Sequence, residues 1–121
     1  MKITIETVDR MRYATIGDWQ FAPNGDLTIR VKRLGDERYE QLVAVHELIE
    51  ALLCRVNRVD ELEVDDFDMQ FDGEGEPGDD PDCPYQTEHF AATTVERILS
   101  AEMGVAWSEY AAALYGSSCP V

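Results

Sequence analysis

His46, Glu47 and Glu50 stand within about one turn of a helical pattern, at a spacing that suits a metal ion. Because each residue of a helix turns by about 100°, side chains four positions apart lie one above the other. The imidazole of His46 and the carboxylate of Glu50 could therefore bind one ion together. Glu47 lies one position round the helix, where a carboxylate could take a proton from water beside that ion. The spacing predicts a metal site with Glu47 as a general base.

A second helical segment supplies the remaining candidate ligands. Glu88 and His89 lie near its start, and Glu96 follows His89 by two turns on the same side. We predict zinc or another divalent metal bound by His46, Glu50 and His89, with Glu88 or Glu96 as a fourth ligand or as a hydrogen-bond partner of a ligand. Two histidines and one carboxylate form a set that catalytic zinc sites use while keeping one position open.

The same residues also allow an interpretation without a metal. His46 could form a hydrogen bond with Glu50, and Glu47 could be a solvated surface acid. Glu88 lies within an apolar stripe, where an unpaired carboxylate costs several kcal/mol. A metal would satisfy Glu88, and so would a tyrosine hydroxyl, an arginine of a neighbouring molecule, or partial exposure.

The elements that must position these residues begin with a sheet. Alternating apolar residues at positions 3–7 predict a half-buried strand. Apolar runs at 19–21 and 27–31 flank an Asn-Gly pair, which accepts the positive φ angles of a tight hairpin turn. Residues 1–34 are therefore expected to form a small antiparallel sheet of two or three strands.

Residues 36–116 predict a helical region. Asp36 is typical of an N-cap, and apolar residues recur at helical spacing from 37 to 57. A shorter acidic helix is expected over 60–71. Residues 72–84 predict a flexible loop, because Gly and Pro break regular structure and clustered acids repel one another. Two further helices complete the region.

Apolar periodicity predicts which side of each helix faces the core. In the acidic helix it selects Leu62, Phe67 and Phe71. In the helix that carries His89, the apolar face comprises Ala91, Val95, Ile98 and Leu99. We expect a single α+β domain over residues 1–121, with three or four helices packed on one face of the sheet.

Composition and charge restrict the classes of function. The chain has 121 residues, of which 45% are hydrophobic, so a real core can form. Its net charge of −15 repels the phosphates of nucleic acids and of anionic lipids, and we expect neither direct nucleic-acid binding nor membrane binding. The same charge could attract a basic protein or mimic nucleic acid.

The first residues hold no apolar run long enough for a signal peptide, and no run reaches the roughly 18 apolar residues of a membrane helix, so we expect a cytoplasmic protein. Three widely spaced cysteines, Cys54, Cys83 and Cys119, suit reduced thiols in that compartment.

Residues 46–50 resemble the metal-binding helix of zincin metallopeptidases. The zincin signature is His-Glu-x-x-His, and Glu50 stands where the family has its second His. The resemblance covers the hairpin and the first long helix. It implies that His46 is a zinc ligand and Glu47 the base. It also implies a zincin-like fold, in which this helix lies beneath a small sheet whose edge strand binds an extended peptide.

Three segments together, 45–54, 76–80 and 88–90, are similar to small uncharacterised proteins encoded in bacteriophage and prophage genomes. This resemblance spans most of the chain and implies a phage-related setting.

Two hypotheses of different classes follow. The first is a metal-binding, zincin-like protein that acts as a zinc-dependent, peptidase-like hydrolase on a peptide. The second is a non-enzymatic acidic phage interaction protein, either a DNA mimic or an inhibitor of a basic host protein. In both cases the helical half could also form a homo-oligomer.

Overall fold

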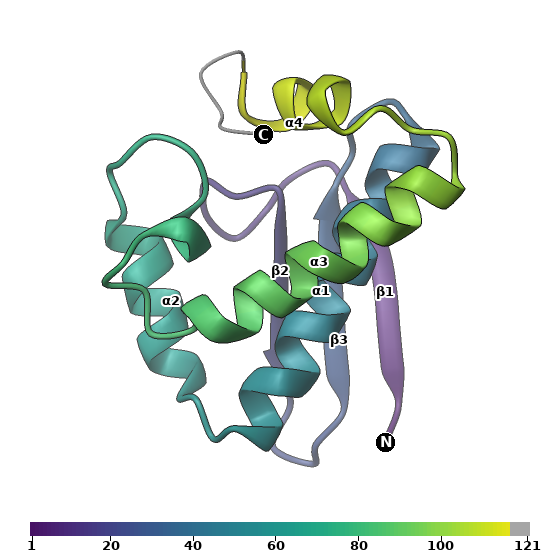
Figure 1. Ribbon diagram of the computed structural model, residues 1–121. Coiled ribbons are helices and arrows are strands. Elements are labelled where there is room, and N and C mark those ends of the chain that lie inside the picture. The colour runs from purple at the N-terminus through teal and green to yellow at the C-terminus, as the bar shows by residue number, and fades with distance from the viewer. Residues whose placement is uncertain (117–121) are drawn as a thin grey trace.

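The fold is a small three-stranded sheet with helices stacked on one face (Figure 1). The computed structural model describes residues 1–116. The strands are β1 (Ile3–Val8), β2 (Gly17–Phe21) and β3 (Leu27–Lys32), in the spatial order β1-β3-β2. The predicted α+β class is confirmed.

The sheet is mixed, whereas the sequence predicted an antiparallel one. β2 and β3 form the expected antiparallel hairpin, with Gly25 at a φ of 93° in its turn. β1, however, pairs with β3 in parallel. The segment 9–16 is long enough to carry the chain from β1 across to the far side of β3. β3 is therefore the central strand, and its alternate side chains are almost fully buried.

Helix α1 (Glu37–Val56) lies between the sheet and helix α3 (Gln86–Glu102) (Figure 1). It begins as predicted, with the Asp36 side chain accepting a hydrogen bond of 2.9 Å from the backbone N–H of Arg38. Because partners cover it on two sides, α1 buries apolar residues such as Leu42 as well as His46 and Glu50.

The remaining elements are α2 (Glu61–Gln70), the short 3₁₀ turn η1 (Pro77–Asp79) and α4 (Trp107–Tyr115). The η1 turn lies within the segment that the sequence predicted as a flexible loop, and it packs against α3. Backbone hydrogen bonds from Asp79 to Glu76 and from Asp80 to Pro77 close this turn.

The buried face of α3 is mostly polar and agrees only in part with the face predicted from apolar periodicity, of which Leu99 packs against the core. Its buried residues are Glu88, His89, Ala92, Glu96 and Ser100. In contrast, Val95 is 37% exposed and Ile98 is 62% exposed. The physical reason is that α3 packs on the side of α1 that carries buried polar groups, where its own polar side chains find partners.

The core-facing side of α2 also differs from the prediction at one position. Leu62 is 70% exposed, and Val64 is buried in its place. Phe67 does pack against the core, and Phe71 is partly buried.

Two further sequence expectations concern the membrane and the thiols. Within residues 1–116, no helix combines the length and apolar character needed to cross a membrane. Cys54 and Cys83 are buried free thiols, and Cys119 lies outside the described residues.

We expect Leu42→Ala to lower the free energy of unfolding by about 2–5 kcal/mol, because Leu42 is 0% exposed and truncation leaves a cavity. Leu62→Ala is the matched control and should change it by less than about 0.5 kcal/mol. Urea unfolding of both variants in the presence of a chelator checks this. Equal losses would contradict the assignment of Leu42 to the core and of Leu62 to the surface.

Candidate metal centre

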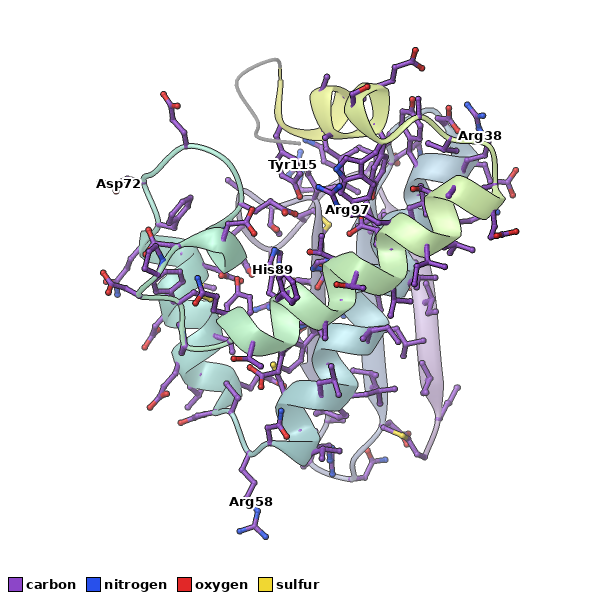
Figure 2. The ribbon with its side chains drawn as sticks, viewed as in Figure 1. Arg38, Arg58, Asp72, His89, Arg97 and Tyr115 are labelled. Atoms are coloured by element: carbon purple, nitrogen blue, oxygen red, sulfur yellow. The ribbon has the colours of Figure 1, made fainter. Side chains whose placement is uncertain are left out.

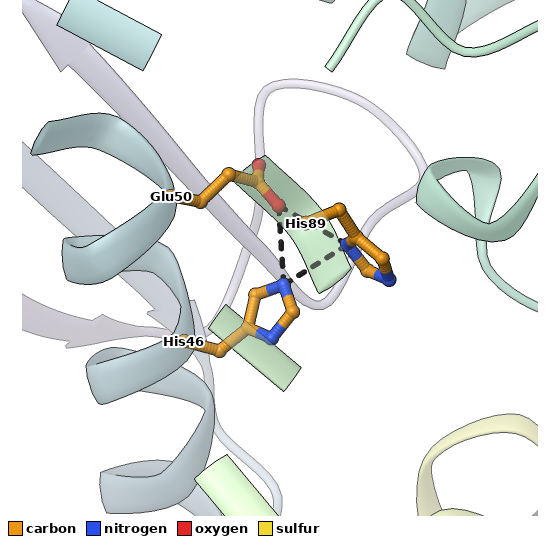
Figure 3. Close-up of side chains that lie close together, drawn as sticks. All are labelled: His46, Glu50 and His89. Atoms are coloured by element: carbon orange, nitrogen blue, oxygen red, sulfur yellow. Dashed lines mark hydrogen bonds and ion pairs between the residues drawn. The ribbon is translucent and has the colours of Figure 1, made fainter. Parts of the chain in front are cut away.

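Three ligand atoms from α1 and α3 converge on one point in the interior (Figure 3). They are Nε2 of His46, Oε2 of Glu50 and Nδ1 of His89. Each of the three separations is 3.1 Å, so the atoms form an equilateral triangle. Helix α1 contributes two of them through its i, i+4 spacing, and α3 contributes the third. The structure therefore brings together the three ligands that the sequence proposed.

The size of this triangle matches the coordination shell of zinc. Ligands bonded at about 2.0–2.1 Å in a tetrahedron are separated by roughly 3.3 Å from one another. Three donors at 3.1 Å would therefore need only small movements to hold one ion.

All three side chains are withdrawn from solvent. His46 is 6% exposed, and Glu50 and His89 are each 4% exposed. In Figure 2, His89 points from α3 into the interior, whereas Arg58 and Asp72 point outward. Groups that bind a cation or carry charge at this depth require partners on every side.

In each imidazole ring, the outer nitrogen, which is the one that points away from the triangle, lies close to a carboxylate. Nδ1 of His46 lies 2.8 Å from Oε1 of Glu96, whose other oxygen accepts a hydrogen bond from the Tyr110 hydroxyl. Nε2 of His89 lies 3.2 Å from Asp79 and 3.3 Å from Glu76. Metal-binding histidines are generally oriented by a carboxylate in this way.

Two further contacts fix the orientation of the ligands. The indole N–H of Trp19 donates a 3.1 Å hydrogen bond to Oε1 of Glu50, which leaves Oε2 for the triangle. The backbone of Gly78 lies directly against the ring of His89. A Cβ at Gly78 would stand 2.2 Å from both Cγ and Nδ1 of that ring, so no larger residue fits.

The hydrogen-bond pattern explains why a cation suits this triangle. If His46 donates through Nδ1 to Glu96, and His89 donates through Nε2 to Asp79 or Glu76, their inner nitrogens carry no proton. Two nitrogen lone pairs and a carboxylate oxygen then face one another and repel. A cation between them removes this repulsion.

Without a metal, protons can take the place of the cation. Burial lowers the pKa of His89, but contacts with Asp79, Glu50 and Glu76 outweigh it and raise the pKa to about 12. Burial of Glu50 favours its neutral form, yet hydrogen bonds from the two imidazoles lower its pKa to about 2. A metal must displace these protons, so its affinity falls as the pH falls.

Glu47 lies beside the triangle at a cavity of about 520 Å³. The three ligands and Glu47 all line this cavity, so an ion held by them could be reached from it. A Cβ at Gly17 would come within 2.8 Å of Oε1 of Glu47, so a glycine in β2 makes room for this carboxylate. Burial, followed by the charge of Glu50, raises the pKa of Glu47 well above its usual range.

The two remaining candidates have different positions. Glu96 is a hydrogen-bond partner of the candidate ligand His46, the second of the two positions predicted for it. Glu88 lies elsewhere, because its Oε2 accepts a 2.7 Å hydrogen bond from the side chain of Asn57 at the end of α1.

The sequence analysis did not name Trp19, Glu76 or Asp79 as partners of the candidate ligands. Trp19 lies in a predicted strand, and the two acids lie in the segment expected to be a flexible loop. The Glu-Pro-Gly-Asp sequence of residues 76–79 is typical of a turn and could have indicated an ordered segment.

No protein-family model, curated protein or solved structure gives a significant match to this chain.

We expect Glu96→Gln to weaken zinc binding by about 10–100-fold, because the neutral amide orients His46 less firmly and lowers its basicity. Glu102→Gln, an exposed change on the same helix, should leave zinc affinity unchanged. Competition with a chromogenic chelator measures both. Equal affinities in the two variants would contradict a supporting role for Glu96.

Proposed function

We propose that this chain is a zinc-binding, zincin-like protein of the cytoplasm that acts as a peptidase-like hydrolase. The observation that carries this proposal is the buried triangle of His46, Glu50 and His89, with all sides of 3.1 Å. Each imidazole is backed by a carboxylate, and all three ligands line one cavity.

The donor set favours zinc among the common divalent ions. Two imidazoles and one carboxylate suit zinc or a similar transition metal better than magnesium or calcium, which prefer oxygen ligands. A bound zinc would supply a Lewis acid at the wall of the cavity.

Glu47 is the proposed general base. It follows His46 directly on α1 and lines the same cavity, so its carboxylate can take a proton from a water molecule there. Burial raises its pKa above the usual range, and the carboxylate is a stronger base in consequence once it is deprotonated.

Strand β2 is the proposed site for an extended peptide. It is an outer strand of the sheet, and Gly17, Asp18 and Trp19 line the cavity. The outward backbone N–H of Phe21 in this strand already donates to the side chain of Glu61. A peptide would therefore add to the rest of this edge, beside Gly17, Asp18 and Trp19, through main-chain hydrogen bonds. This position agrees with what the zincin resemblance implies.

Protein purified without chelator or a histidine tag should contain at least about one equivalent of zinc. His46→Ala should lose the zinc of the triangle. Because binding to the native state stabilises it, adding a chelator should lower the free energy of unfolding of the wild type by about 3 kcal/mol when free zinc was about 100-fold above Kd. Elemental mass spectrometry and thermal unfolding measure these effects. Absence of zinc from the wild type, with no stabilisation on adding zinc, would refute the metal site.

Glu47→Gln should keep the zinc but reduce hydrolysis of labelled casein by about 10²–10⁴-fold, because it removes only the base. Glu37→Gln, at an exposed position of the same helix, is the control and should retain full activity. Full activity in the Glu47 variant would exclude Glu47 as the base. If the zinc-loaded wild type cleaves no member of a mixed peptide library, the protein binds metal without acting as a hydrolase.

The second hypothesis, an acidic interaction protein, keeps one specific observation in its favour. Part of the acidic sequence forms the ordered helix α2, which carries no basic residue in its last turn. An ordered array of carboxylates is a better mimic of DNA phosphates than a flexible loop. Such a protein would bind basic DNA-binding proteins with a strong dependence on salt, irrespective of zinc.

A further inference from the structure

The outer nitrogen of His89 faces a second group of possible metal ligands. Its Nε2 lies 3.2 Å from Oδ1 of Asp79 and 3.3 Å from Oε2 of Glu76. The three atoms lie within 4.8 Å of one another. Their distances from Nε2 match the separation of roughly 3.3 Å between neighbouring ligands of a tetrahedral zinc.

The η1 turn determines this arrangement. Glu76 directly precedes this turn and Asp79 is its last residue, and both carboxylates lie close to Nε2 of His89. The Tyr115 hydroxyl binds Oε1 of Glu76 and leaves Oε2 facing His89. The backbone of Gly78 presses against the ring, which holds the imidazole and the turn in register.

Hydrogen bonding alone matches these groups poorly. Nε2 can donate one proton, yet two carboxylate oxygens approach it at nearly equal distances. The ring is 4% exposed and the Glu76 side chain 22% exposed, whereas the Asp79 side chain is 65% exposed and keeps contact with water on its outer side. A divalent ion would bind both oxygens and the nitrogen at once.

From these contacts we propose that Glu76, Asp79 and Nε2 of His89 form a second zinc site, with His89 bridging it to the first. The inference rests on the proposed function, because the first ion occupies the other nitrogen of the same ring. When the second ion binds, the proton on Nε2 leaves to solvent and the ring becomes an imidazolate. The imidazolate and the carboxylates of Glu50, Glu76 and Asp79 together balance two divalent charges.

The second ion has a structural role in the loop that borders the cavity. The two ions would be bridged by an imidazole ring and two metal–nitrogen bonds of about 2.0–2.1 Å each. They would therefore lie farther apart than the roughly 3.5–4 Å between the ions of two-metal catalytic sites. However, Gly73, Gly75 and Glu76 line the cavity. Zinc at Glu76 and Asp79 would therefore attach this acidic segment to α3 and set the shape of the entrance.

Native mass spectrometry with stepwise addition of zinc to chelator-stripped protein tests the inference. We expect two zinc ions on the wild type and one on the E76Q/D79N variant. The D72N/D82N variant removes two exposed acids from the same loop and should still bind two. Hydrogen exchange of residues 72–84 should slow with the second equivalent of zinc in the wild type and in D72N/D82N, but not in E76Q/D79N.

Each other outcome is decisive. A single zinc on the wild type, or a second zinc that survives in E76Q/D79N, would overturn the second site and leave the first intact. No zinc on any variant would overturn the proposed function and this inference together. If E76Q/D79N bound no zinc, the single variant D79N would distinguish loss of the second site from loss of the fold. The Asp79 side chain is 65% exposed, so this single change should leave the fold intact. One zinc on D79N supports the second site, and two zinc ions on D79N overturn it.

Discussion

The carboxylate of Glu50 lies between two imidazole rings inside the contact between α1 and α3, and the arrangement around it depends on keeping that charge satisfied. An isolated carboxylate at this depth would cost several kcal/mol. Trp19 supplies a donor to one oxygen, and the two histidines face the other. The outer nitrogens of those rings then need carboxylates of their own, which come from Glu96 and from the η1 turn. One buried charge thus accounts for a network that spans four elements.

Helix α1 contributes residues both to the hydrophobic core and to the candidate metal site. The face toward α3 carries the ligand pair. On its other sides α1 is largely apolar, and residues such as Ala51 belong to a core cluster with the alternate residues of β3. Because the sheet side contributes hydrophobic stabilisation, the α3 side can be polar without loss of the fold. This division also explains why α3 leaves apolar residues such as Ile98 exposed.

The acidic character of the chain has a related consequence. A net charge of −15 disfavours a compact state through self-repulsion, and residues 72–84 add acids close to the site. Bound cations would offset part of this repulsion where it is strongest. The same charge makes the cavity a poor environment for anionic ligands, whereas a neutral or basic peptide would enter without an electrostatic penalty.

The sequence by itself determined the elements and the ligand pair on α1. Periodicity predicted α1 within one residue of its observed end, an Asn-Gly pair predicted the hairpin, and the i, i+4 spacing placed His46 beside Glu50. These features depend on interactions between near neighbours in the chain, which a sequence records directly.

The tertiary structure decided the rest. The parallel pairing of β1, the polar face of α3 and the approach of η1 to His89 depend on contacts between distant segments. Apolar periodicity was right for Leu99 and wrong for Val95 and Ile98, because it assigns burial to apolar side chains and takes no account of polar side chains that find partners. Only packing in three dimensions brings those partners within hydrogen-bonding distance, and that distance determines which polar side chains can be buried.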